Sequence, residues 1–203
     1  MNCRTFASPW GNEDTQALID ILAQYDVKTT FFVVGDWAEK YPESVKALHD
    51  AGHEVMSHSN HHDHYNSLST QQIIDDVTAS NQRISGTTGV TPTLIRCPYG
   101  EYDDHVIAAI RSMGMEPIQW DVDSLDWKDY DAETICRRVT SKVQPGSIVL
   151  FHNAALHTPE ALPQILEYLI NEGYTVLPIS QLILDAPYTI DHTGRQFPVE
   201  HAG

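Results

Sequence analysis

Short apolar runs alternate with amphipathic stretches along nearly the whole chain, and this alternation limits the folds open to it. Residues 29–34 are β-branched or aromatic throughout, which is typical of a strand buried on both faces. The same pattern predicts further strands over 3–7, 54–56, 92–96, 115–120, 147–151 and 174–177, and helices over 15–25, 43–50, 69–84, 103–113, 131–142 and 159–171. About seven βα units of this length predict parallel strands with helices outside, in an open doubly wound sheet or a barrel.

A length of 203 residues with 41% apolar composition favours one domain with a real core. We expect this domain to cover residues 1–187. Residues 188–203 form a C-terminal extension, in which the turn at Thr193-Gly194 predicts a hairpin. The chain has neither a G-x-G-x-x-G sequence nor a P-loop, so a nucleotide-binding form of the open sheet has no support.

The charge balance excludes some partners. Twelve Lys and Arg residues face 28 Asp and Glu residues, a formal net charge of −16, which repels nucleic-acid backbones and anionic membrane surfaces. No apolar run approaches the ~20 residues of a membrane helix, and the N-terminus lacks the apolar region of a signal peptide. We therefore expect a cytoplasmic chain, or a domain of a longer exported protein. The widely spaced Cys3, Cys97 and Cys136 predict free thiols.

Unusual polar residues follow the predicted strands. They are Ser8, His58, the turn from Arg96 to Gly100, Asp123 with Asp126, and His152. The carboxyl ends of parallel strands share one face of a barrel, and active sites form on that face. Polar residues after five different strands therefore predict a single site.

The spacing of His58 and His62 allows both imidazoles to contact one metal ion. A zinc-protease motif would have Glu at position 59, where this chain has Ser59, so a metallopeptidase is disfavoured. His61 and His64 lie in the same stretch, and the alternative interpretation is a solvated histidine-rich loop.

Two further segments carry chemical groups. Pro98 and Gly100 shape a tight turn after Arg96, which can aim backbone N–H groups into a cleft as an oxyanion hole; the alternative is a structural ion pair of Arg96. Asp126 can hold the tautomer of His152, and the alternative for His152 is a histidine satisfied at the rim of the core.

These segments, in this order, resemble the polysaccharide deacetylase family, also called the NodB-homology domain or carbohydrate esterase family four. The matching stretches are Thr5-Phe6, His58-Ser59-x-x-His62, Arg96-Cys97-Pro98-Tyr99-Gly100, Asp123-Ser124-Leu125-Asp126-Trp127 and Leu150-Phe151-His152. Residues 10–15 are similar to the sporulation-associated bacterial branch. The resemblance implies a single-domain distorted (β/α)7 barrel that removes acetyl groups from peptidoglycan, chitin-type oligomers or acetylated xylan, in a family often exported to the cell wall.

The resemblance also implies a role for each matched residue. His58 and His62 would bind a divalent metal, zinc or else cobalt or nickel, and the backbone N–H of Tyr99 would stabilise the oxyanion. His152 would be the general acid, tuned by Asp126, and Arg96 would hold the catalytic base. Trp127, Leu150 and Pro98 would line the substrate pocket.

The chain departs from the family in its first motif, where T-F-D-D is replaced by Thr5-Phe6-Ala7-Ser8. Both carboxylates, the base and a metal ligand, are absent. Ala7 is either an engineered inactivating change or the mark of a natural glycan-binding pseudoenzyme; otherwise Glu13 or Asp14 substitutes as base, although both also suit the start of a helix. The resemblance thus implies a metal-dependent polysaccharide de-N-acetylase, impaired at position 7. Acetylxylan esterase and inactive glycan-binding protein are the alternatives.

Overall fold

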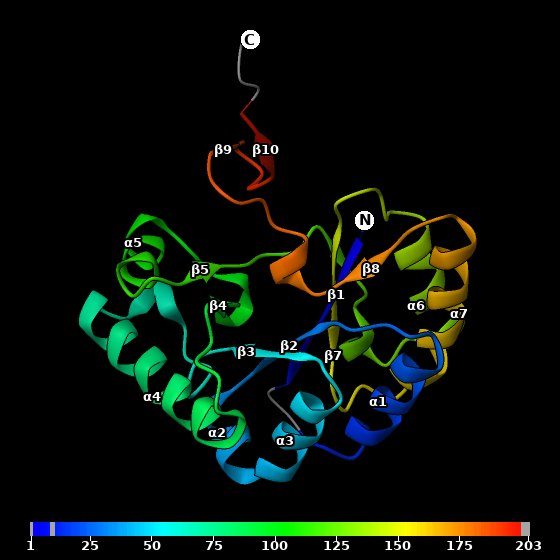
Figure 1. The fold of residues 1–203 in the computed structure, drawn as a ribbon, viewed down its shortest axis with the longest axis horizontal. Coiled ribbons are helices and arrows are strands. Elements are labelled where there is room, and N and C mark those ends of the chain that lie inside the picture. The colour runs from blue at the N-terminus through cyan, green and yellow to red at the C-terminus, as the bar shows by residue number, and fades with distance from the viewer. Residues whose placement is uncertain (1, 9–10, 200–203) are drawn as a thin grey trace.

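Eight parallel strands form a curled sheet in the computed structural model of the protein (Figure 1), which describes residues 2–8 and 11–199, with the backbone alone for residues 2–5 and 8. Seven strands follow the order β5-β4-β3-β2-β1-β7-β6, and β8 pairs with the start of β1. Their bounds are β1 Asn2–Ser8, β2 Thr30–Val33, β3 Glu54–Ser57, β4 Leu94–Ile95, β5 Glu116–Pro117, β6 Val122–Asp123, β7 Ile148–His152 and β8 Val176–Leu177. This is the distorted barrel expected from the sequence.

Helices cover the outside of the sheet (Figure 1). They are α1 Thr15–Gln24, α2 Gly35–Lys40, α3 Pro42–Asp50, α4 Thr70–Thr88, α5 Asp104–Ser112, α6 Ala132–Thr140 and α7 Thr158–Asn171. Helix α4 starts where its sequence predicts, because Ser69 and Gln72 form a reciprocal capping box. Asp131 likewise caps α6 by accepting the Thr134 N–H at 2.8 Å.

The middle of the sheet is held by aromatic packing between neighbouring strands. Phe6 of β1 stacks on Phe31 of β2, with ring centroids 4.7 Å apart, and on Phe151 of β7 at 5.7 Å. The side chains of β1 alternate, so Ala7 points away from this layer and into the barrel. Its partners across the sheet are Phe32 and His152.

Several observed elements differ from those predicted, among them the short strand β6, which was not predicted. The strand expected over 115–120 shortens to β5, because Pro117 has no N–H to donate and the Gln119 carbonyl accepts from Arg96 instead of a strand. Helix α2 was not predicted, since its six residues are too few to display a helical period.

The sheet ends at β5 and β6, each with one neighbour in the described part of the chain. The predicted C-terminal hairpin is present as β9 Tyr188–Ile190 and β10 Gln196–Pro198, and Arg195 beside it donates to the Pro145 carbonyl at 2.7 Å. No helix within residues 2–8 and 11–199 is long and apolar enough to cross a membrane. Cys97 and Cys136 form no disulfide, whereas the side chain of Cys3 lies outside the described residues.

Candidate active site

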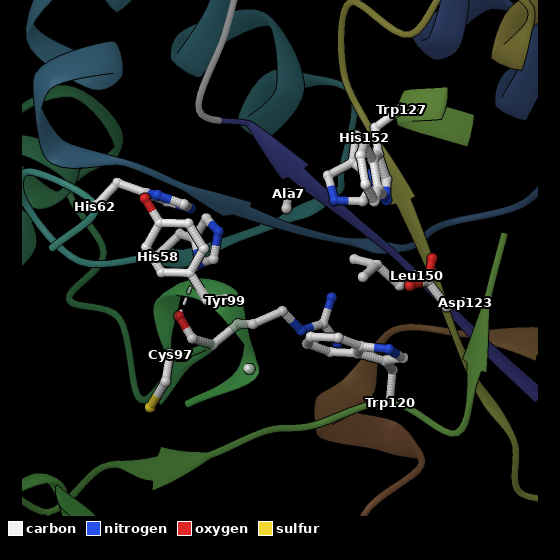
Figure 2. A pocket seen from close by; sticks show the side chains of 12 residues that line it. Ala7, His58, His62, Cys97, Tyr99, Trp120, Asp123, Trp127, Leu150 and His152 are labelled. Atoms are coloured by element: carbon white, nitrogen blue, oxygen red, sulfur yellow. Dashed lines mark hydrogen bonds between the residues drawn. The ribbon is translucent and has the colours of Figure 1, made fainter. Parts of the chain in front are cut away.

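A cleft of about 510 Å³ opens at the carboxyl ends of the strands (Figure 2), a volume in the usual range for small-ligand sites. Its lining residues are Ala7, His58, His62, Arg96, Cys97, Tyr99, Gly100, Trp120, Asp123, Trp127, Leu150 and His152. Eight of the ten residues singled out from the sequence therefore meet here. The other two are buried beside it: Asp126 behind His152, and Pro98 within the turn that carries Tyr99.

His58 and His62 form the metal-ligand candidate pair. His58 follows β3, and its Nδ1 lies 2.7 Å from the Arg96 carbonyl, which fixes the ring and leaves Nε2 for a ligand. The two ring centroids are 4.9 Å apart. Burial, and then the mutual proximity of the imidazoles, lower the pKa of His58; burial and nearby His152 lower that of His62. Both rings are thus held neutral, as metal ligands must be.

The neighbouring histidines serve other purposes. His61 Nδ1 lies 2.8 Å from Asp36 of α2. His64 Nδ1 lies 2.7 Å from Glu101, and its ring stacks on Tyr99 with centroids 4.0 Å apart. The histidine-rich stretch is therefore an ordered loop in which each ring has a separate contact.

The predicted contact between Asp126 and His152 is present. Nδ1 of His152 lies 2.8 Å from Oδ1 of Asp126, so the carboxylate sets the tautomer and presents Nε2 outward. Asp126 is fully buried, and its Oδ2 also accepts the backbone N–H of His152 at 2.8 Å and the Thr158 hydroxyl at 2.7 Å. Three hydrogen bonds thus compensate the buried charge.

The turn after β4 is rigid. The buried Arg96 donates to the carbonyls of Ile118 and Gln119 and lies over the Phe32 ring at 4.5 Å. Tyr99 has a left-handed backbone with φ of 58°, a strained conformation for a tyrosine. The turn's own hydrogen bonds are donated by Gly100 and Glu101, so the Tyr99 N–H is not used within it. That N–H suits an oxyanion donor.

Position 7 carries no group that could accept a proton. Ala7 is 2% exposed and presents a methyl group to the cleft. Among the described lining residues Asp123 is the only carboxylate, and its Oδ1 accepts the Leu125 N–H at 2.9 Å. Asp14 lies outside the lining, where its Oδ2 accepts the Ala154 N–H at 2.8 Å, and burial raises the pKa of Asp14 to about 6.

Trp120 also lines the cleft, although sequence reasoning did not place it in the site. Asp123 and Cys97 lie in segments that were predicted to meet at the site, but neither residue was given a role of its own. Trp120 carried no usable signal, because it follows an irregular segment whose direction depends on the Arg96 contacts.

The fold and the arrangement of the cleft are those of the polysaccharide deacetylase family. A profile described as "Polysaccharide deacetylase" matches residues 4–118, and the chain belongs to this family. It is 33% identical to the peptidoglycan-N-acetylmuramic acid deacetylase PdaC of Bacillus subtilis over 83% of this chain and 35% of that protein. It is 30% identical to the uncharacterised YlxY of the same organism, over 86% of this chain and 54% of that protein. The chain thus spans about half or less of these curated relatives.

Solved structures agree. The wild-type protein BA3943 of Bacillus anthracis, termed a CE4 family pseudoenzyme, matches with a TM-score of 0.87 and 34% identity over 90% of this chain and 64% of that one. A BA3943 mutant described as having restored enzymatic activity matches with a TM-score of 0.86 and 34% identity, over 90% of this chain and 66% of that one.

Membership of this family implies a divalent metal, and the cleft contains side chains of the type that bind such a metal. His58 and His62 supply two neutral imidazoles in the cleft. No group of three or more His, Cys, Asp or Glu side chains suited to a metal occurs among the residues described. The described side chains therefore offer two ligands here, one fewer than the three that catalytic zinc sites usually have.

Proposed function

We propose that this chain binds N-acetylated glycans in the cleft and, with Ala at position 7, releases acetate far more slowly than a site with a carboxylate there. The observation that supports this most directly is the Ala7 methyl group, which lines the cleft beside His152. A methyl group cannot accept a proton from an attacking water, and general-base assistance is worth about 10² to 10⁴ in rate.

The rest of the cleft suits the recognition of an acetamide. The Tyr99 N–H can donate to the acetyl oxygen, and His152, oriented by Asp126, can donate a proton to the leaving nitrogen. Trp127 and Leu150 supply the apolar walls that an acetyl group needs. A divalent metal held by His58 and His62 would polarise the carbonyl of the acetyl group. The net charge of −16 favours uncharged stretches of glycan over acidic ones.

One observation favours a second candidate function, in which the chain is an active deacetylase with Ala at position 7. The Asp123 carboxylate lines the same cleft. Its Oδ1 accepts the Leu125 N–H, and its second oxygen, Oδ2, is the atom that could accept a proton. This candidate requires that Asp123 accept the proton in place of residue 7.

The test measures binding and turnover separately. Titration calorimetry with an N-acetylglucosamine tetramer reports binding. Acetate release from that tetramer and from acetylxylan, with zinc or cobalt added, reports turnover. We expect the unaltered chain to bind the tetramer. Ala7→Asp should release acetate about 10² to 10⁴ times faster than the unaltered chain. Ala7→Asn, whose side chain has the shape of Asp but cannot act as a base, should give no gain.

Each contrary result has a distinct meaning. Turnover by the unaltered chain that Ala7→Asp does not improve, and that Asp123→Asn abolishes, would establish the second candidate. Faster turnover of acetylxylan than of the tetramer would assign the site to esters. Absence of glycan binding by the unaltered chain would refute the proposal.

A further inference from the structure

The loop that carries the candidate metal ligands has an unfavourable backbone. Ser59 has φ of 72° and His62 has φ of 63°, a left-handed conformation that residues with a side chain seldom adopt. Such a conformation persists only where the surrounding structure holds it. The position of the His62 imidazole relative to His58 therefore depends on the contacts that fix this loop.

One set of contacts comes from the start of α2. The Gly35 N–H donates to the Ser59 carbonyl at 2.9 Å. The Asp36 N–H donates to the Asn60 carbonyl at 3.0 Å. Both N–H groups belong to the first turn of the helix, where they have no partner within it. Helix α2 thus holds carbonyl groups of the loop and leaves the N–H groups of the loop to other partners.

Asp76 of α4 supplies one of those partners. Its Oδ2 accepts the Asn60 N–H at 2.8 Å and the Tyr65 hydroxyl at 2.6 Å. Tyr65 follows His62 by three residues and is fully buried, so its ring anchors the far end of the loop. Hydrogen bonds to a carboxylate are stronger than those between neutral groups. Asp76 therefore ties the chain on both sides of His62 to one helix.

A series of hydrogen bonds also leads from Asp76 to His62 itself. The His62 N–H donates to the Ser59 hydroxyl oxygen at 2.8 Å, and the Ser59 hydroxyl is hydrogen-bonded to the Tyr65 hydroxyl. Because Tyr65 donates its own proton to Asp76, the Ser59 hydroxyl is the donor to Tyr65. Each hydroxyl in the series both accepts and donates, and such series strengthen their members.

We propose that Asp76, acting with Tyr65, is a positioning residue that holds the His62 imidazole beside His58 for a divalent metal. The inference rests on the metal pair of the proposed function and adds a residue outside the motif that contains both histidines. Asp76 is not among the described residues that line the cleft, so it acts through the loop and not as a ligand. Without its hydrogen bonds the left-handed residues would relax, and the two imidazoles would have to be brought together again on binding.

The test measures zinc affinity by titration calorimetry in the full chain. Asp76→Ala should weaken zinc binding by about tenfold or more. Tyr65→Phe keeps the buried ring and removes only the hydroxyl, and it should weaken zinc binding by about threefold, the loss typical of one hydrogen bond. Asp76→Asn has an amide oxygen that can accept the same two hydrogen bonds, and it should bind zinc within about threefold of the wild type.

Two control variants separate positioning from charge and from stability. Asp75→Ala removes the same charge at the next position of α4, where Asp75 is exposed and accepts from Gln71. Ser69→Ala removes the N-cap of α4 and so destabilises the helix. Both should bind zinc as the wild type does. Chemical denaturation of Ser69→Ala and Asp76→Ala gives the loss of stability against which each zinc affinity is compared.

Four results would overturn the positioning role while the metal pair stands. They are wild-type zinc affinity in Asp76→Ala, the same loss of affinity in Asp75→Ala, the same loss in Ser69→Ala at equal loss of stability, and no recovery in Asp76→Asn. If Asp76→Ala does not fold, unchanged zinc affinity in Tyr65→Phe overturns it instead.

Failure of the metal pair would look different. Absence of zinc binding by the wild type, or zinc binding unchanged in the double variant His58→Ala, His62→Ala, would overturn the pair and the inference together. Absence of tetramer binding by a wild type that binds zinc would refute the proposed function and leave the inference standing.

Discussion

Asp126 Oδ1 lies 2.8 Å from His152 Nδ1, whereas the residue paired with His152 on the neighbouring strand β1 is Ala7. His152, the proposed proton donor, is thus fully oriented, and the buried carboxylate that holds it is compensated by three hydrogen bonds. The position of the proposed proton acceptor, one strand away, carries only a methyl group. Because the buried Asp126 carboxylate and its hydrogen bonds are intact, we expect the cleft to keep its shape although position 7 has no carboxylate.

Asp126→Ala should lower the free energy of unfolding by about 3 kcal/mol, because it leaves the Thr158 hydroxyl and the His152 N–H groups without their buried acceptor. Chemical denaturation measures this difference. Asp75→Ala is the control, since Asp75 is exposed on α4 and accepts only from Gln71, and it should change stability by less than about 0.5 kcal/mol. Equal effects of the two variants would contradict the assigned role of Asp126.

Zinc should bind weakly, at one ion per chain, through His58 and His62. Calorimetric titration with zinc should show binding by the wild type and none by the double variant His58→Ala, His62→Ala, because the imidazoles are the ligands. His61→Ala should bind zinc as the wild type does, since His61 is turned toward Asp36. Unchanged binding by the double variant would place the zinc elsewhere.

His53 should make the protein less stable in mild acid. It is 4% exposed, and its Nδ1 accepts the Thr29 N–H at 3.3 Å. Burial, and then the nearby Lys28, lower its pKa to about 4. Between that value and the usual 6.5 the unfolded chain binds a proton that the folded chain does not, so stability falls as pH falls. The contribution is about 2 kcal/mol between pH 7 and pH 5.

The measurement is the difference in unfolding free energy between wild type and His53→Gln at pH 7 and pH 5. A difference is needed because Asp14, whose burial raises its pKa to about 6, contributes the opposite slope, losing stability as pH rises through the same range. His192→Gln, at an exposed position, should leave the wild-type slope unchanged. A slope unaltered in His53→Gln would show that His53 is not the responsible group.

Much of the fold could be predicted from the sequence, because its strands and helices carry local signals. The buried run around Phe31 and Phe32 and the capping box at Ser69 each specify an element without tertiary information. The segment after Met115 could not be predicted, since its path depends on contacts of its carbonyls with the Arg96 guanidinium, a residue more than twenty positions away.

The site shows the same division. His58, Arg96 and His152 could be predicted to line one cleft because each lies at the end of a strand, and strand ends converge in this topology. The stacking of His64 on Tyr99 could not be predicted, because it joins two loops whose relative position follows from packing and from the left-handed backbone of Tyr99. Asp126 was identified as a partner of His152, but its bond to Thr158 comes from a different helix and has no sequence signal.

Position 8 should govern metal affinity independently of position 7. Ser8 ends strand β1, one residue after Ala7, at the position where the family pattern has a metal-ligand Asp. A carboxylate there would add a charged third ligand to the two neutral imidazoles. Ser8→Asp should therefore tighten zinc binding by roughly tenfold or more, measured by calorimetry at constant pH. Ser8→Asn, which has the same size but no charge, should stay close to the wild type. Combined with Ala7→Asp, the substitution should further raise acetate release at limiting zinc, because more of the protein carries metal. If Ser8→Asp and Ser8→Asn bind zinc equally, residue 8 is not a ligand.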